Sequence, residues 1–123
     1  MMPEEKTKLL ELFDDERRWC RNAEARDEND QSVHYDDAAA VAWDLTGALC
    51  HLFGWPRALV LFGQVQRHIA GNHRRVSGWP TRLNSIEAMQ SLQEFNDGEG
   101  TRFPELHAKL ECLPVWKAGA RSK

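Results

Sequence analysis

DDAAAVAWDLTGALCHLFG, residues 36–54, is the stretch with the most continuous apolar pattern in the chain. Its main apolar stripe returns every three or four residues, the period of a helix, at Ala38, Val41, Ala42, Leu45, Leu49 and Leu52. Because further apolar residues surround this stripe, we predict a buried central helix over residues 38–53. Asp36 or Asp37 is expected to cap its first turn. Gly47 is expected to let a neighbouring helix approach closely.

Amphipathic patterns on both sides of this segment predict four more helices. Their expected ranges are 4–25, 56–70, 84–95 and 101–110. Asn84 and Glu87 have the spacing of a capping box, and Thr101 is expected to cap the last helix. The sequence therefore predicts an all-α fold, with about five helices in one compact domain over residues 1–123. We expect a frayed tail from about residue 117.

Composition restricts the class of protein. The chain has 123 residues, of which 41% are hydrophobic and 28% are charged, as expected for a globular domain and not for a disordered one. Cys20, Cys50 and Cys112 are odd in number and widely spaced, which favours free thiols in a reducing compartment. The first residues lack the apolar run of a signal peptide, and no apolar stretch reaches the ~20 residues of a membrane span. We expect a cytoplasmic protein that makes no membrane contact.

The formal net charge of −3 hides an asymmetry along the chain. Residues 1–50 carry 13 acidic and 6 basic side chains, whereas residues 51–123 carry 6 acidic and 10 basic ones. Halves of opposite sign are typical of surfaces that meet within a fold or across an interface. A homodimer is one form that such an interface could take.

Motifs that indicate catalysis or cofactor binding are missing from the sequence. We find no glycine-rich phosphate loop, no metalloprotease motif and no paired C-x-x-C. Cys50 and His51 are adjacent on a predicted helix and point in different directions, and His68 with His73 lacks further ligands. We therefore expect no cofactor and no metal, and we favour a non-enzymatic protein.

The segment 71–85, between the third and fourth predicted helices, is read as a long basic loop. Arg74, Arg75 and Arg82 flank Trp79, and arginines beside an aromatic ring are suited to gripping phosphate and stacking a base. One interpretation is a nucleic-acid interface over residues 67–82. The other is a solvated loop whose arginines pair with the acidic half of the chain.

Two polar clusters are candidates for an enzymatic site. His34 stands beside Asp36 and Asp37, where a carboxylate can poise an imidazole as a general base. Asn96 and Asp97 lie in a glycine-rich turn and are candidate binding residues. The simpler interpretation is structural in both cases, with the aspartates capping a helix and the turn residues bonding their own backbone.

The five tryptophans favour a contact surface. Trp19 and Trp43 belong to the predicted core, whereas Trp55, Trp79 and Trp116 fall at helix ends or in loops, where exposed rings often mark interfaces. Our leading hypothesis is a small helical domain that binds another macromolecule, most simply a protein. A phage-type or mobile-element modulator of host machinery fits this size and class. The alternatives are nucleic-acid binding through the basic loop and an enzyme with a site near His34 and Asn96-Asp97.

Scattered positions also resemble a known family. These are Trp19-Cys20 with Ala23, Ala25 and Asp27, the central segment from Ala38 to Leu49, and Phe95-Asn96-Asp97 with the helix that follows. They are similar to a family of small bacterial and phage proteins defined only as a domain of unknown function. The resemblance implies a helical fold and no particular activity. It places any shared site at Asn96 and Asp97, although Phe95 stands where that family usually has tryptophan.

Overall fold

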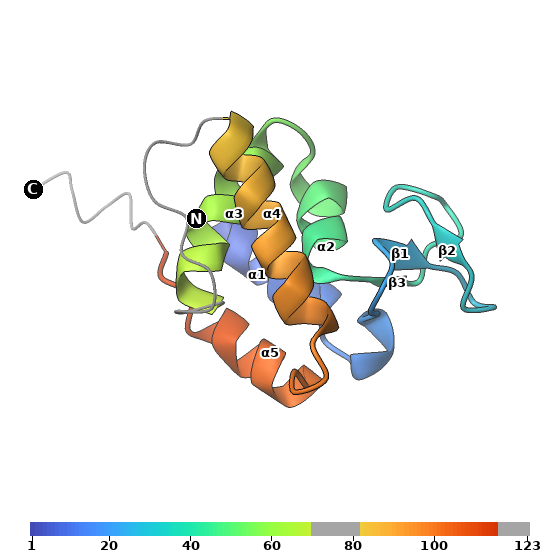
Figure 1. Ribbon diagram of the computed structural model, residues 1–123. Coiled ribbons are helices and arrows are strands. Elements are labelled where there is room, and N and C mark those ends of the chain that lie inside the picture. Colours follow the sequence, from blue (N-terminus) through green and yellow to red (C-terminus); the bar gives the residue numbers. More distant parts are fainter. Residues whose placement is uncertain (70–81, 116–123) are drawn as a thin grey trace, which may run out of the picture.

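The structure is a computed structural model that describes residues 1–69 and 82–115. In these residues the chain forms five α-helices and a small sheet (Figure 1). In chain order the elements are α1 (Pro3–Leu12), the 3-10 turn η1 (Glu16–Arg18), β1 (Ala25–Arg26), β2 (Ser32–Val33), β3 (Ala42–Trp43), α2 (Leu45–Phe53), α3 (Arg57–Ile69), α4 (Arg82–Asp97) and α5 (Phe103–Glu111). None of these helices has the length and apolarity needed to cross a membrane.

The helices enclose one hydrophobic core. α3 packs along α4, while α2 contacts α1, α3 and α4, and α5 closes the core against α1 and α3 (Figure 1). The largest fully buried side chains are Phe13, Phe62, Leu9, Leu45, Leu49, Leu61, Ile69, Leu92, Leu106 and Leu110. Trp43 is buried as predicted, whereas Trp19 packs against the core and is only partly covered.

The sheet corrects the all-α prediction. Three antiparallel strands of two residues each lie in the order β2-β1-β3 and extend from the helical body beside α2 (Figure 1). Ala25 is the Cα partner of both Val33 and Trp43. The fold is therefore mostly helical with a small antiparallel sheet.

The predicted first helix, 4–25, is wrong beyond Leu12. Asp15 caps the short turn η1 by accepting a hydrogen bond from the backbone N–H of Arg17, and Asn22 has a positive φ of 62°, which an α-helix cannot contain. The backbone of Cys20 donates to the carbonyl of Trp43 instead of continuing a helix. Apolar spacing alone extended the prediction across this polar run, where aspartates compete for backbone N–H groups.

The central helix begins seven residues later than predicted. Asp44 is its N-cap and accepts a hydrogen bond from Gly47 N at 2.6 Å, so neither Asp36 nor Asp37 caps α2. The preceding residues are extended because β3 pairs with β1. Gly47 does permit a close approach, but the neighbour is the backbone carbonyl of Glu24, not a helix.

The later helices agree better with the sequence. α3 matches the predicted 56–70 closely, and Pro104 lies in the first turn of α5 as expected. α4 begins at Arg82, two residues before the predicted cap Asn84, so the capping box is wrong. The N-cap of α5 is Arg102, not Thr101.

Candidate binding surfaces

Asn96 connects three parts of the fold. Its side chain is fully buried, and Oδ1 accepts hydrogen bonds from Trp19 Nε1 at 2.6 Å and from Leu45 N at 3.1 Å. Its Nδ2 donates to the carbonyl of Cys20 and to Asp97 Oδ1, each at 3.0 Å. All the hydrogen-bonding capacity of the amide is therefore satisfied within the protein.

Asp97 extends the same junction. Its Oδ1 also accepts a hydrogen bond from the backbone N–H of Asn22 at 2.9 Å. These bonds join the end of α4 to the segment before β1 and to the start of α2. The structure thus gives Asn96 and Asp97 a connecting role that needs no ligand.

The second predicted polar cluster, His34 with Asp36 and Asp37, makes contacts of its own before β3. His34 is exposed and contacts Tyr35, with ring centroids 4.0 Å apart and ring planes tilted by 33°. Asp36 pairs with His51, Oδ1 to Nδ1 at 2.9 Å, and Asp37 accepts from the backbone N–H of Ala39. These contacts order the chain leading into β3.

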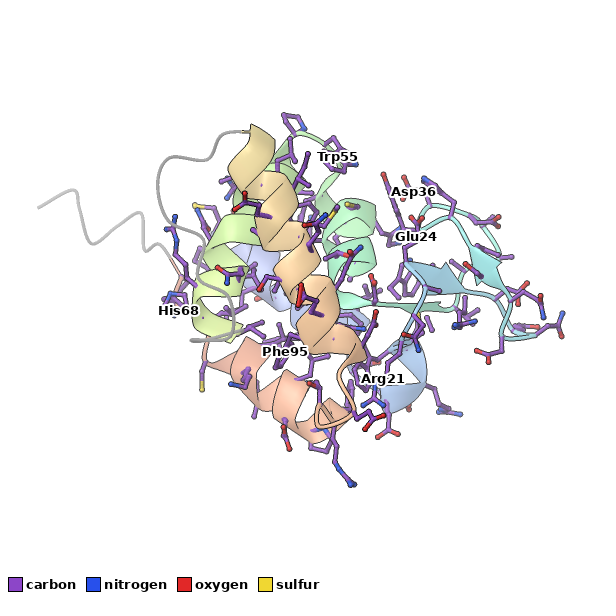
Figure 2. All side chains as sticks on the ribbon, in the orientation of Figure 1. Arg21, Glu24, Asp36, Trp55, His68 and Phe95 are labelled. Carbon is purple, nitrogen blue, oxygen red and sulfur yellow. The ribbon has the colours of Figure 1, made fainter. Side chains whose placement is uncertain are left out.

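Most of the predicted basic interface lies outside the described residues. Arg74, Arg75 and Trp79 lie outside them, and so does the tail from residue 116. Of Arg82 only the backbone is described, as the first residue of α4. Arg67 and His68 are exposed on the last turn of α3. Figure 2 shows the position of His68 there.

An ion pair between α1 and α3 joins the acidic and basic halves of the chain. Arg57, at the start of α3, forms two hydrogen bonds of 2.7 Å with Glu5 of α1. This bidentate bond is the main reason that the pKa of Glu5 is lowered.

Two of the three cysteines are buried, which disfavours the reactive thiolate form. Burial raises the pKa of both Cys20 and Cys50 to about 12, so these thiols stay protonated at neutral pH. Cys112 is exposed. Among residues 1–69 and 82–115, no three His, Cys, Asp or Glu side chains are grouped to hold a metal ion.

Trp55 is the most exposed large hydrophobic side chain in the described chain, at 52%. It follows Gly54, which ends α2 with a positive φ of 67°. Its Nε1 donates to the hydroxyl of Tyr35 at 3.0 Å, and its ring meets Phe62 edge-on at 5.9 Å. The ring is therefore held in one orientation while half of its surface faces solvent.

Trp55 forms one side of a cavity of about 260 Å³, which we call the tryptophan groove. The groove is lined by Glu24, Tyr35, Thr46, Gly47, Cys50, Trp55, Met89 and Gln93. Met89 and Gln93 lie one turn apart on α4, and the exposed Ile86 precedes Met89 by one turn on the same face. Glu24 and Asp36 lie on the side of the molecule that carries the sheet (Figure 2).

Comparisons with protein-family models, curated proteins and solved structures find no match to this chain.

Sequence reasoning identified Trp55 but not its surroundings. Tyr35 stands between His34 and Asp36, and Met89 lies within the predicted fourth helix, but no motif singles out either residue. The only local signal was the Gly54-Trp55-Pro56 break between two helices, which places a large ring at an exposed turn. No pattern in the sequence relates Tyr35 and Met89, which are far apart along the chain.

Proposed function

We propose that this protein binds a segment of another protein in the tryptophan groove, and that the segment carries an apolar anchor flanked by Lys or Arg. The observation that carries the proposal is Trp55, whose ring is half exposed and yet fixed by Tyr35 and Phe62. Free exposure of so large a ring is unfavourable in water and favours a contact surface.

The fixed ring lowers the cost of binding. Immobilising a flexible side chain at an interface costs roughly 0.5–1.5 kcal/mol, and Trp55 is already ordered by a hydrogen bond and a ring contact. Tryptophan is also enriched among the few residues that supply most of the binding energy in interfaces. The volume of about 260 Å³ lies just below the ~300–1,000 Å³ of small-molecule pockets, which favours side chains of a bound segment over a whole small molecule.

The charge around the groove defines the partner. Glu24 lines it, and Asp36 and Asp37 are exposed next to Tyr35. A basic flank on the partner would face these carboxylates, which favours association and disfavours acidic segments.

Panning a random peptide library on the full chain tests this proposal. We expect enriched peptides to combine an aliphatic or aromatic residue with neighbouring Lys or Arg, and to lose at least about 10-fold in affinity on Trp55→Ala. Val41→Ala is the matched control, because Val41 is 39% exposed and does not line the groove.

Two results would overturn the proposal. One is a set of peptides that binds Trp55→Ala as tightly as the parent while both proteins show the same unfolding midpoint. The other is a homodimer in native mass spectrometry that Trp55→Ala dissociates, because a second copy would then occupy the groove.

A further inference from the structure

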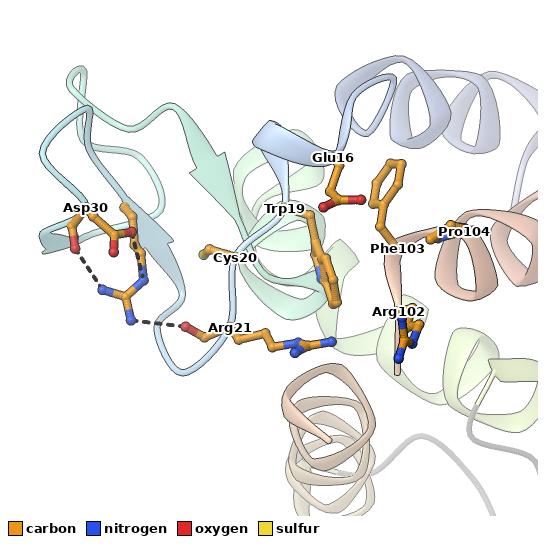
Figure 3. A pocket seen from close by; sticks show the side chains of 9 residues that line it. Glu16, Trp19, Cys20, Arg21, Asp30, Arg102, Phe103 and Pro104 are labelled. Atoms are coloured by element: carbon orange, nitrogen blue, oxygen red, sulfur yellow. Dashed lines mark hydrogen bonds and ion pairs between the residues drawn. The ribbon is translucent and has the colours of Figure 1, made fainter. Parts of the chain in front are cut away.

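A second cavity lies between the segment after η1, strand β1 and the start of α5 (Figure 3). Its volume is about 630 Å³, and its wall includes Trp19, Arg21, Arg26, Arg102 and Phe103. It shares no lining residue with the tryptophan groove. An inference about this cavity therefore stands independently of the proposed protein-binding function.

Arg26 is the one arginine of this wall that pairs with a carboxylate among residues 1–69 and 82–115. Its Nε lies 3.7 Å from Asp30 Oδ1. Its two Nη atoms donate to the carbonyls of Asp30 and Arg21, at 2.9 and 3.0 Å (Figure 3). Arg26 thereby orders the backbone on which Arg21 is carried.

Arg21 is held in place with no carboxylate partner in the described part of the chain. Its Nη2 donates to the carbonyl of Thr101, and its guanidinium lies 4.8 Å from the centroid of the Trp19 ring. Its Nε is buried and has no hydrogen-bond partner in the described structure. Within the described residues, this partly buried positive charge is therefore balanced by a carbonyl dipole and a ring face and not by a carboxylate.

Arg102 brings a second uncompensated charge to the same cavity. It is exposed at the N-cap of α5, and its side chain makes no hydrogen bond or ion pair with the described residues. The side chain of Arg21 extends beneath Trp19 toward it (Figure 3). Glu16 and Asp30 also line the cavity, so three guanidinium groups face two carboxylates and leave a net positive charge.

We infer that this cavity binds a phosphomonoester of a planar organic group, of which a nucleoside monophosphate is the simplest example. The phosphate lies between Arg21 and Arg102, and the planar group lies against the wall formed by Phe103 and Pro104. Guanidinium groups match phosphate oxygens with paired hydrogen bonds, so two of them favour a dianion over a single negative charge. A volume of about 630 Å³ falls in the range of small-molecule sites.

Titration of the full chain with adenosine 5′-monophosphate, followed by two-dimensional NMR, tests this inference. The indole N–H of Trp19 and the Nε–H of Arg21 give separate signals, and we expect both to shift in a saturable way at millimolar ligand or below. Arg102→Gln is expected to weaken binding at least ~10-fold, because it removes one of the two phosphate ligands without a folding contact. Arg17→Gln is the control, since Arg17 is exposed, pairs with Asp15 and does not line this cavity.

Adenosine and inorganic phosphate, used as separate probes, distinguish the two parts of the ligand. We expect each to bind more weakly than the complete nucleotide. Binding of inorganic phosphate as tight as that of the nucleotide would overturn the role of the Phe103 wall. No saturable shift up to about 10 mM, or an equal loss of affinity in Arg17→Gln and Arg102→Gln, would overturn the site itself.

Discussion

Removal of the Asn96 side chain should break the hydrogen bonds that connect α4 to α2 and to the segment before β1. Asn96→Ala leaves the indole N–H of Trp19 and the backbone N–H of Leu45 without their acceptor in a buried region. It also deprives the carbonyl of Cys20 and the carboxylate of Asp97 of a donor. An unsatisfied buried group costs roughly 1–3 kcal/mol, and the four losses are not additive because water can enter the space.

We therefore expect Asn96→Ala to lower the free energy of unfolding by about 3–5 kcal/mol, a large part of the 5–15 kcal/mol typical of a domain. Urea unfolding followed by circular dichroism measures this loss. With a slope of about 1.5 kcal/mol per molar urea, the midpoint should fall by roughly 2–3 M.

Two variants make this prediction decisive. Asn29→Ala removes the same side chain from an exposed turn and should change the free energy of unfolding by less than about 0.5 kcal/mol. Asn96→Asp keeps the acceptors but places a carboxylate beside Asp97, so its stability should recover as pH falls and the introduced group is protonated. A loss below about 1 kcal/mol in Asn96→Ala would refute the reasoning, because it would mean that the junction holds without the amide.

Three further predictions follow from local geometry. Asp44→Asn should keep the cap of α2. In the parent protein the free energy of unfolding should fall as the pH rises from about 4 to 6, and Asp44→Asn should remove this fall. Urea titrations across that pH range measure the effect, and an unchanged pH profile would contradict it. Gly47→Ala should lower the free energy of unfolding by at least ~1–3 kcal/mol, because the new Cβ would collide with a backbone carbonyl. Gly63→Ala, which has open space around it in α3, should raise the free energy of unfolding by about 0.5–1 kcal/mol. Equal thermal unfolding midpoints of the two variants would contradict both expectations. In the folded state only the thiol of Cys112 should react rapidly with a thiol reagent at pH 8, because Cys20 and Cys50 are buried. In denaturant all three thiols should react. Rapid reaction of a second thiol in the folded state would contradict this burial.

The sign of the Asp44 effect follows from proton binding. Burial raises the pKa of Asp44 from 3.8 to about 6, so between these values the folded state holds a proton that the unfolded state has released. The free energy of unfolding contributed by this group is therefore fully present below pH 3.8 and is lost as pH rises through about 6. Asparagine removes the titration while its side-chain oxygen can still accept from the first turn of the helix.

The helices that the sequence predicted well are those whose pattern is local and complete. α3 carries an uninterrupted amphipathic period between a proline and a glycine, and its bounds differ from the expected 56–70 by one residue at each end. The prediction failed in residues 13–25 and 38–44, where apolar residues follow a helical spacing but the backbone is largely extended or turned. Strands of two residues leave no alternation to detect, so their formation depends on pairing with distant segments.

The candidate surfaces divide in the same way. The sequence alone indicated Trp55, because Gly54 and Pro56 force a turn around a large ring. The predicted first helix, 4–25, included Arg21, and nothing in the sequence relates Arg21 to Arg102 or Asn96 to Leu45. Local propensity thus determined where most helices form. Only tertiary packing, which brings residues far apart in the chain together, decided that Asn96 is a buried connection and that two arginines share one cavity. It also moved the start of α2 to Asp44, because the preceding residues pair with β1.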